Sequence, residues 1–274
     1  MIKTMPQIIN NNKDNIRLPK YELHILKEKK NKYLICIPVI NEGDKFLNQL
    51  KSMLEAGIDN VADIIICDGG STDGSTSVKM LSEYNVTALI IRKSSGHLSD
   101  QLMLGYYYAI KEGYEGTITM DGNGKDGVEG IYTFVKALND GYDLIQGSRY
   151  IEGGIAINTP KLRELAIKLI HVPIINHVSG FKYTDTTNGF RGHSIRVLKD
   201  ERIQPCRYGD FPTYALIHYL TVKVPQLGYK VTEVPVMRKY PLTGKVPTKI
   251  SPIKGNIDLM KILLNIVLKK YDPK

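Results

Sequence analysis

The chain has 274 residues, of which 42% are apolar and 24% charged, enough for one large domain with a full hydrophobic core. This composition excludes general disorder and collagen-like structure, and no apolar run is long enough to predict a membrane-spanning helix. The net charge is +9, and residues 221–274 hold 11 basic and 3 acidic side chains. Such a basic tail favours a phosphate-rich ligand or contact with an anionic membrane. No nucleic-acid-binding signature accompanies the charge, so nucleic acid is not an expected partner.

The start of the chain and its cysteines indicate a cytoplasmic protein. Residues 1–32 read as an N-terminal lead-in without the apolar core of a secretory signal. Cys36, Cys67 and Cys206 are too few and too scattered for a disulfide framework or a four-thiolate metal site. We therefore expect buried, reduced thiols and a cytoplasmic location, at the inner face of a membrane if the substrate is a lipid.

From residue 33 onward, short apolar runs alternate with amphipathic helical stretches. Strands are expected at 33–40, 62–68, 87–92, 116–122 and 143–150, with helices between them. Strands that read as continuous apolar runs between helices indicate an α/β fold, a mostly parallel sheet with helices on both faces. Ligands of such sheets bind at the carboxyl ends of the strands. Those ends carry Asn41, Glu42, Asp68, Arg92, Asp121 and Arg149.

After residue 150 the alternation is less regular. We expect helices at 161–171 and near 211–223, and a strand at 230–237. Residues 239–255 contain three Pro and two Gly and read as a loop, followed by an amphipathic helix that ends in lysines. We expect residues 241–274 to pack on the same domain as 33–240. The loop is predicted to close over a bound diphosphate, with a solvated basic surface or a patch that contacts anionic lipid as the alternatives.

Two motifs at strand ends suit a nucleotide. Asn41 and Glu42 close the strand that contains Pro38, and they could hold a ribose or base, or cap the next helix. Asp68 begins the run DGGSTDGS, in which small residues allow close approach of a ligand. Its carboxylate can accept a hydrogen bond from a base. The alternative for this run is an ordinary Asp/Gly/Ser turn.

A third motif, MDGNGKD at 120–126, suits a metal. It places Asp121, Asn123 and Asp126 together, and their oxygens are ligands that Mg²⁺ or Mn²⁺ prefers. A cation there could neutralise a departing diphosphate. The motif could also be a turn that holds nothing. Basic residues of the second half could clamp phosphate as a group, although each alone reads as a surface charge. They are Arg149, Arg163, Arg191, Arg238, Lys245, Lys249 and Lys254.

The order of these motifs resembles one enzyme family. A PxxNE strand end, DGGSTDGS, SSGHLSDQLMLGYYYAI, MDGNGKD, GSRY and DTTNGFRG follow one another between residues 33 and 240. This arrangement is similar to the family-2 inverting glycosyltransferases, in the branch of dolichyl-phosphate mannose synthase and related polyprenyl-phosphate sugar transferases. The resemblance implies a GT-A fold, a nucleoside-diphosphate sugar donor and a divalent metal, Mg²⁺ or Mn²⁺. It implies transfer to a lipid phosphate or a glycan hydroxyl.

The resemblance also implies roles for individual residues. Pro38, Asn41, Glu42 and Asp68 would line the nucleoside pocket. Asp121 and Asn123 occupy the D-x-D positions that engage the diphosphate and its metal, with Asp126 as a further ligand. Arg149, Arg163 and Arg191 would face the phosphates of donor or acceptor.

Three positions depart from the branch, and they keep alternatives open. Asn123 replaces the second Asp of D-x-D, Lys125 occupies a metal-ligand position, and Ile167 stands where the branch has Ser. A hydroxyl acceptor would need a carboxylate base, for which Asp210 is the candidate, with a helix cap as its alternative. Two rival classes of protein remain. One is a nucleotidyltransferase, which would need a Gly-rich basic loop after the first strand. The other is a catalytically silent nucleotide-sugar binding protein.

Overall fold

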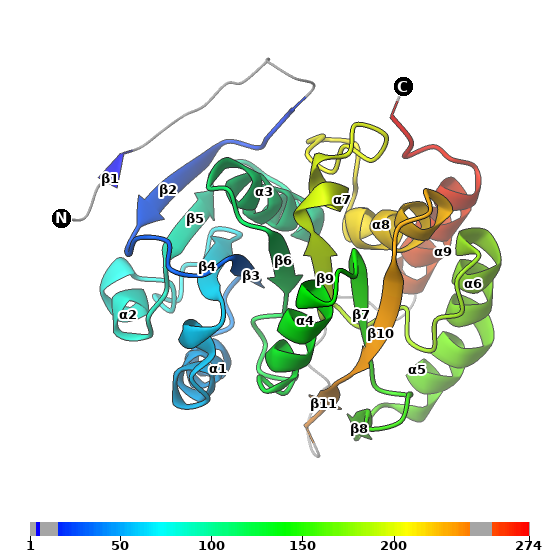
Figure 1. The fold of residues 1–274 in the computed structure, drawn as a ribbon, viewed down its shortest axis with the longest axis horizontal. Coiled ribbons are helices and arrows are strands. Elements are labelled where there is room, and N and C mark those ends of the chain that lie inside the picture. Colours follow the sequence, from blue (N-terminus) through cyan, green and yellow to red (C-terminus); the bar gives the residue numbers. More distant parts are fainter. Residues whose placement is uncertain (1–3, 6–15, 242–253, 274) are drawn as a thin grey trace.

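The computed structural model describes residues 4–5, 16–241 and 254–273, and side chains in 16–241 and 258–273. Within these residues one sheet has nine strands in the order β1-β2-β5-β4-β3-β6-β9-β7-β10 (Figure 1). Strands β3 to β7 and β10, which include all the expected ones, run parallel to one another. The strands are β1 Thr4–Met5, β2 Tyr21–Ile25, β3 Tyr33–Val39, β4 Asp63–Asp68, β5 Ala88–Arg92, β6 Gly116–Thr119, β7 Leu144–Ser148, β9 Arg191–Ser194 and β10 Val231–Pro235. The predicted α/β architecture is confirmed.

Helices cover both faces of this sheet, because the strands are apolar on both sides. Along β3, Ile35 and Ile37 pack in one core with Phe46 and Phe134, whereas Leu34 packs on the opposite face. The helical segments are α1 Asp44–Glu55, η1 Ile58–Asn60, α2 Val78–Glu83, α3 Leu98–Lys111, α4 Gly130–Asn139, α5 Lys161–Ala166, the π-helical η2 Ile167–His171, α6 Val172–Ser179, α7 Ile195–Lys199, α8 Ala215–Gln226 and α9 Lys254–Val267.

A glycine brings α3 close to the sheet. A Cβ atom at Gly105 would lie 2.9 Å from Cys36 Sγ and 3.0 Å from Cys67 Sγ, too close for any larger residue. The three cysteines are buried and free, as expected. Close packing of α3 places its first turns against the carboxyl ends of β3 and β4. There the Gln101 side-chain amide donates to the carbonyls of Val39, at 2.8 Å, and Cys67, at 2.7 Å.

Two antiparallel strands were not expected from the sequence. Residues Tyr21–Ile25, predicted as part of a lead-in, form β2, which pairs with β5. Strand β9 lies antiparallel between β6 and β7. Its sequence, RGHS, gives no apolar signal, yet its first three residues are buried. The start of β9 therefore lies at the carboxyl ends of its neighbours, and this brings the DTTNGFRG motif to the expected site.

The helix predicted at 161–171 extends further than expected. Segments α5, η2 and α6 follow one another directly, so that the helical run continues to Ser179, where Gly180 ends it in a left-handed conformation. A second, two-stranded sheet joins β8 (Ile155–Ile157) to β11 (Met237–Lys239). None of the helices in the described part of the chain combines the length and apolar character needed to cross a bilayer.

Candidate functional site

The two loops that follow β3 and β4 are joined by hydrogen bonds. Asn41, with a φ of 50°, accepts from the backbone N–H of Thr72 through its side-chain oxygen at 2.7 Å, and its own N–H donates to Ser71 Oγ at 3.0 Å. The Gly43 N–H donates to Asp73 at 2.9 Å. Pro38 is buried within β3, and Glu42 is half-buried just after it. These contacts hold the predicted nucleoside residues at one corner of the sheet edge, which we call the donor edge.

Asp68 is at the centre of the donor edge. One of its carboxylate oxygens accepts from the N–H groups of Gly70 and Ser71 and from the Ser71 hydroxyl, at 2.7–3.1 Å. The other accepts from Thr76 Oγ1 at 3.0 Å. Because an ionised carboxylate has about four acceptor positions, most of its capacity is used inside its own loop. The structure therefore gives Asp68 the role of shaping the DGGSTDGS loop.

Asp121 and Asn123 lie together after β6. The Asn123 amide donates to Asp121 Oδ2 at 3.3 Å, and the Asp121 side chain is 24% exposed. Gly189, from the loop before β9, packs against this pair, since a Cβ there would lie 2.7 Å from Asp121 Oδ1. Mg²⁺ is usually held by one or two carboxylates together with substrate phosphates. The pair therefore fits one face of a divalent cation, with one carboxylate and one amide oxygen as ligands.

Arg238, on β11, joins this motif to the end of the sheet. Its guanidinium donates to Asp121 Oδ2 at 2.9 Å and to Asp126 Oδ2 at 2.6 Å. Burial alone would raise the pKa of Asp121, but the Arg238 charge brings it below its ordinary value. At Asp126 burial outweighs the same charge and raises the pKa to about 6.

The metal-ligand role expected of Asp126 needs correction. Its side chain is 0% exposed and lies under Arg238, so it does not reach the surface on which Asp121 and Asn123 open. A buried guanidinium needs a carboxylate partner, and Asp126 supplies it. We therefore assign Asp126 to holding Arg238. Sequence spacing within the motif did not reveal this, because Arg238 comes from more than a hundred residues away.

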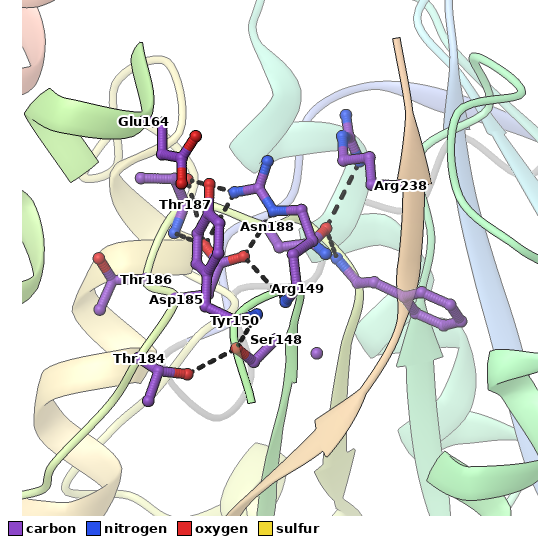
Figure 2. Close-up of polar contacts among 12 residues, drawn as sticks. Ser148, Arg149, Tyr150, Glu164, Thr184, Asp185, Thr186, Thr187, Asn188 and Arg238 are labelled. Atoms are coloured by element: carbon purple, nitrogen blue, oxygen red, sulfur yellow. Dashed lines mark hydrogen bonds and ion pairs between the residues drawn. The ribbon is translucent and has the colours of Figure 1, made fainter. Parts of the chain in front are cut away.

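Arg149 is held by a carboxylate from the DTTNGFRG loop. Its guanidinium makes a two-pronged contact with Asp185, at 2.6 and 2.9 Å, and donates to Thr187 Oγ1 at 3.0 Å. Figure 2 shows Arg149 and Arg238 on either side of Asn188, with which Arg238 is in contact at 3.4 Å. Two arginines thus converge on one loop from β7 and β11. Asp185 and Asn188 were not predicted as site residues, although the polar run before β9 was a signal.

Arg191 is the second correction. It is 2% exposed, and its guanidinium donates to the main-chain carbonyls of Thr186, Asn188 and Ile217 at 2.8–3.0 Å. Burial lowers its pKa to about 10. A guanidinium enclosed in this way faces carbonyls and not a substrate phosphate. Arg191 therefore holds the DTTNGFRG loop in shape, and does not face a phosphate as the resemblance implied.

Three positively charged side chains of the site surround the ring of Tyr240. Lys125, Arg163 and Arg238 all lie near its ring, at 5.5–5.8 Å from the centroid, and Arg163 reaches its hydroxyl at 3.4 Å. Burial would raise the pKa of Tyr240, but Arg238, Arg163 and Arg149 together bring it below its ordinary value. The positive potential is therefore concentrated beside Asp121. We call the region of Arg149, Arg163, Arg238, Lys125 and Tyr240 the acceptor edge.

The last three predicted residues are Asp210, Lys249 and Lys254. Asp210 is in ion pairs with Arg17, at 2.5 Å, and Arg207, at 3.1 Å. Asp210 is therefore an ion-paired loop residue and does not cap helix α8, whose N-cap residue is Tyr214. Lys249 lies outside the described residues, as does most of the predicted lid. Lys254 begins α9, but its side chain is outside the described set.

Comparison with known families gives one match that covers most of the chain. Residues 34–203 match the model described as glycosyl transferase family 2. The polyprenol monophosphomannose synthase of Mycolicibacterium smegmatis is 26% identical over 74% of this chain and 76% of its own length. The undecaprenyl-phosphate mannosyltransferase of Micrococcus luteus is 25% identical over 74% of this chain and 82% of its own length.

Solved structures support the fold. Glucosyl-3-phosphoglycerate synthase from Mycobacterium tuberculosis, crystallised with Mn²⁺, uridine diphosphate and glucosyl-3-phosphoglycerate, superposes with a TM-score of 0.60 at 12% identity. The superposition covers 87% of this chain and 79% of that one. The fold is the GT-A fold, as expected from the sequence.

Proposed function

Because the chain belongs to glycosyl transferase family 2, and is therefore a glycosyltransferase, we propose that it transfers a sugar from a nucleoside-diphosphate sugar to a lipid phosphate, with inversion at the anomeric carbon. The nucleoside would bind at the donor edge, where Asn41 and Asp68 order two loops. The diphosphate would bind at Asp121. The named activities of the relatives in Mycolicibacterium and Micrococcus support a polyprenol-type acceptor.

The observation that carries this proposal is the concentration of positive charge at the acceptor edge. Arg163 and Arg238 lie on Tyr240, and Arg238 also contacts Asp121. Both a departing diphosphate and an acceptor phosphate are anions, and fixed cations between them would stabilise the charge that develops on the leaving group. A phosphate acceptor is already ionised and needs no strong base. This suits a site whose carboxylates are held by arginines.

A divalent cation, Mg²⁺ or Mn²⁺, fits the remaining donor set. Asp121 and Asn123 would hold it together with phosphate oxygens of the donor. When bound, such an ion neutralises charge on the diphosphate. In this proposal Asp121 and Asn123 position the diphosphate, and Arg238 orients Asp121.

A glycan hydroxyl is the weaker choice of acceptor. It would need a carboxylate to take its proton. Asp210, the candidate from the sequence, is engaged by Arg17 and Arg207. Ile167 occupies the position at which a Ser was expected, and it is buried, so an acceptor phosphate would rely on Arg163 instead.

Transfer assays with the purified protein test this proposal. A panel of nucleotide sugars would be offered with a polyprenyl phosphate or with oligosaccharides, with and without Mn²⁺, and products identified by mass spectrometry. We expect a lipid-linked sugar phosphate whose anomeric configuration is opposite to that of the donor. Transfer only to oligosaccharides would refute the lipid acceptor. Donor binding without transfer or hydrolysis would indicate a nucleotide-sugar binding protein. In a parallel assay with nucleoside triphosphates and a sugar 1-phosphate, release of pyrophosphate would indicate a nucleotidyltransferase.

A further inference from the structure

Large apolar side chains are exposed mainly on two helical segments. Away from these segments, the exposed large apolar residues in the described part of the chain are scattered singly, at Leu54, Tyr132 and Ile155. The two segments contribute Leu162, Leu165, Leu169, Ile170, Met260, Leu264, Val267 and Leu268. Scattered apolar residues are ordinary on protein surfaces, whereas a grouped set marks an interaction site.

The first segment, α5 with η2, has two apolar faces. Leu162, Leu165 and Leu169 follow the i, i+3, i+7 spacing of one helical face, and Leu162 is 81% exposed. Ile167 and His171 are buried, which completes packing against the domain. The outer leucines are therefore not needed to hold the helix on the protein, and they lie in water when the protein is alone.

The second segment, α9, repeats this arrangement. Ile262, Leu263 and Ile266 are buried, while Met260 and Leu264 are four residues apart and exposed. Helix α9 packs beside α6 (Figure 1), which continues the helical run of α5. The two segments that carry the exposed apolar residues are therefore linked through α6, which continues the first segment and contacts the second.

Basic residues accompany the apolar ones. Residues 161–182 hold four basic and one acidic side chain, and the acidic one, Glu164, pairs with Lys168 at 2.6 Å. Lys161, on the first turn of α5, is exposed, as are Lys269 and Lys270 after α9. Leucines flanked by lysines are typical of helices that lie in the interface of a membrane. The charge complements an anionic lipid surface.

We propose that α5, η2 and α9 dock on an anionic phospholipid bilayer, with Leu162, Leu165, Leu169 and Leu264 inserted among the lipids. We call this set of helices the docking surface. The proposal rests on the proposed function in one respect. Arg163 lies on the same helix as the leucines and contacts Tyr240 of the acceptor edge. Docking would bring a lipid-borne phosphate to Arg163 while its apolar tail stays in the membrane.

Vesicle flotation tests this proposal. The full-length protein would be mixed with vesicles of phosphatidylcholine containing about 30% phosphatidylglycerol, and with pure phosphatidylcholine. We expect it to float with the anionic vesicles, and binding to weaken as salt rises from about 0.1 M to about 0.5 M. The double variant Leu165→Gln/Leu169→Gln should bind at least about tenfold more weakly, because two leucines no longer insert.

The matched control is Leu54→Gln/Tyr132→Gln, which removes two exposed apolar side chains from α1 and α4. It should bind like the parent protein. Equal binding by the parent and the leucine variant would overturn the proposal. So would a stable dimer in light scattering that the leucine variant abolishes, because the surface would then be a contact between two copies. Circular dichroism would confirm that the variant keeps its helices.

A short, water-soluble prenyl phosphate separates this proposal from the proposed function. If both hold, the leucine variant transfers sugar to that acceptor at the parent rate but loses transfer to a long-chain acceptor in vesicles. Vesicle binding without transfer to any prenyl phosphate would refute the function and leave the docking surface supported. Transfer to vesicle-borne acceptor that is unchanged in the variant would refute the docking surface alone.

Discussion

The donor edge and the acceptor edge use charged side chains in opposite ways. At the donor edge, Asp68 accepts hydrogen bonds from the N–H groups and hydroxyls of its own loop. At the acceptor edge, Arg149 and Arg238 are buried against Asp185, Asp121 and Asp126. In the first region carboxylates order the backbone of the loops. In the second region carboxylates hold buried arginines in place through ion pairs.

The difference matters for binding. A neutral base and ribose require a fixed shape, which ordered loops provide. Phosphates require concentrated positive charge that is already in position, because reorganising charge during the reaction is costly. Substitutions at the acceptor edge should therefore have large effects through unpaired buried charge, and those at the donor edge smaller effects through loop order.

The largest effect is expected for Arg149→Met. It leaves Asp185 buried without its guanidinium partner, and breaking such a pair costs about 3–5 kcal/mol in the free energy of unfolding. Urea denaturation would measure the loss. The double variant Arg149→Met/Asp185→Asn should recover most of it, because no unpaired charge remains. Lys136→Met, in the exposed pair with Asp140, is the control and should change nothing measurable. If Arg149→Met lowered the free energy of unfolding as little as the control does, the argument that a buried unpaired charge is costly here would be wrong.

Asp121→Asn should have the next largest effect, this time on activity. It removes the charge that faces Arg238 and that would hold the metal of the proposed diphosphate site, and we expect sugar transfer to fall about a hundredfold to a thousandfold. Thermal denaturation should show a folded protein, since the side chain is at the surface of the site. Asp140→Asn, a change of the same kind on an exposed helix end, should transfer normally. Full activity of Asp121→Asn at saturating Mn²⁺ would be incompatible with the proposed diphosphate position.

Stability should also depend on pH through buried histidines. His171, His193 and His218 are all buried. Burial lowers the pKa of His171 to about 4, and burial with the Arg191 charge lowers that of His193 to about 3. Between about pH 6.5 and pH 4 the unfolded chain binds protons that the folded protein does not, so stability falls as pH falls. The slope is about 1.4 kcal/mol per pH unit for each histidine.

Urea denaturation at several pH values would measure this slope. In His171→Phe one histidine no longer contributes, so the slope should decrease by that share. Neither ring nitrogen of His171 has a hydrogen-bond partner among the described residues, and its replacement therefore leaves few groups unpaired. His177, which is exposed on the directly following helix α6, provides the control His177→Phe. An unchanged slope in His171→Phe would show that this histidine is accessible to protons in the folded state.

Most of the strands that lead to the donor edge could be predicted from the sequence. Continuous apolar runs gave β3, β4 and β5, because a buried parallel strand must be apolar on both faces. Strand β9 was missed for the same reason, since its buried Arg191 and His193 have no apolar pattern. The hydrogen bonds from Arg191 to main-chain carbonyls, which make that burial possible, arise only from tertiary contacts.

The arginines of the acceptor edge could be predicted from the sequence, but the carboxylates with which they form ion pairs could not. Arg149, Arg163 and Arg238 were candidates from their positions after strands or in the basic second half. Which carboxylate holds each one depends on contacts between residues far apart in the chain. Asp126 and Arg238 form an isolated bridge between the loop after β6 and β11. Spacing within MDGNGKD therefore suggested a metal ligand where the fold has an arginine partner.

The smallest predicted effect tests the donor edge itself. In Asp68→Asn the carboxylate that accepts four hydrogen bonds becomes an amide, which has one acceptor oxygen and brings two donors. The loop should lose order, and the affinity for a nucleoside diphosphate should fall about tenfold, equivalent to about 1.4 kcal/mol. Calorimetry would measure the affinity, and the free protein should lose about 1 kcal/mol of stability in urea.

The two measurements together decide what Asp68 does. If it shapes the loop, stability and affinity fall together, and Thr76→Val, which removes the contact to the second carboxylate oxygen, should lower both to a smaller extent. If Asp68 instead contacts the base directly, affinity falls while the free protein keeps its stability, and Thr76→Val changes neither. The second result would mean that both edges of the site bind ligand through charged side chains. The donor edge would then differ from the acceptor edge only in that its carboxylate also orders the backbone of its loop.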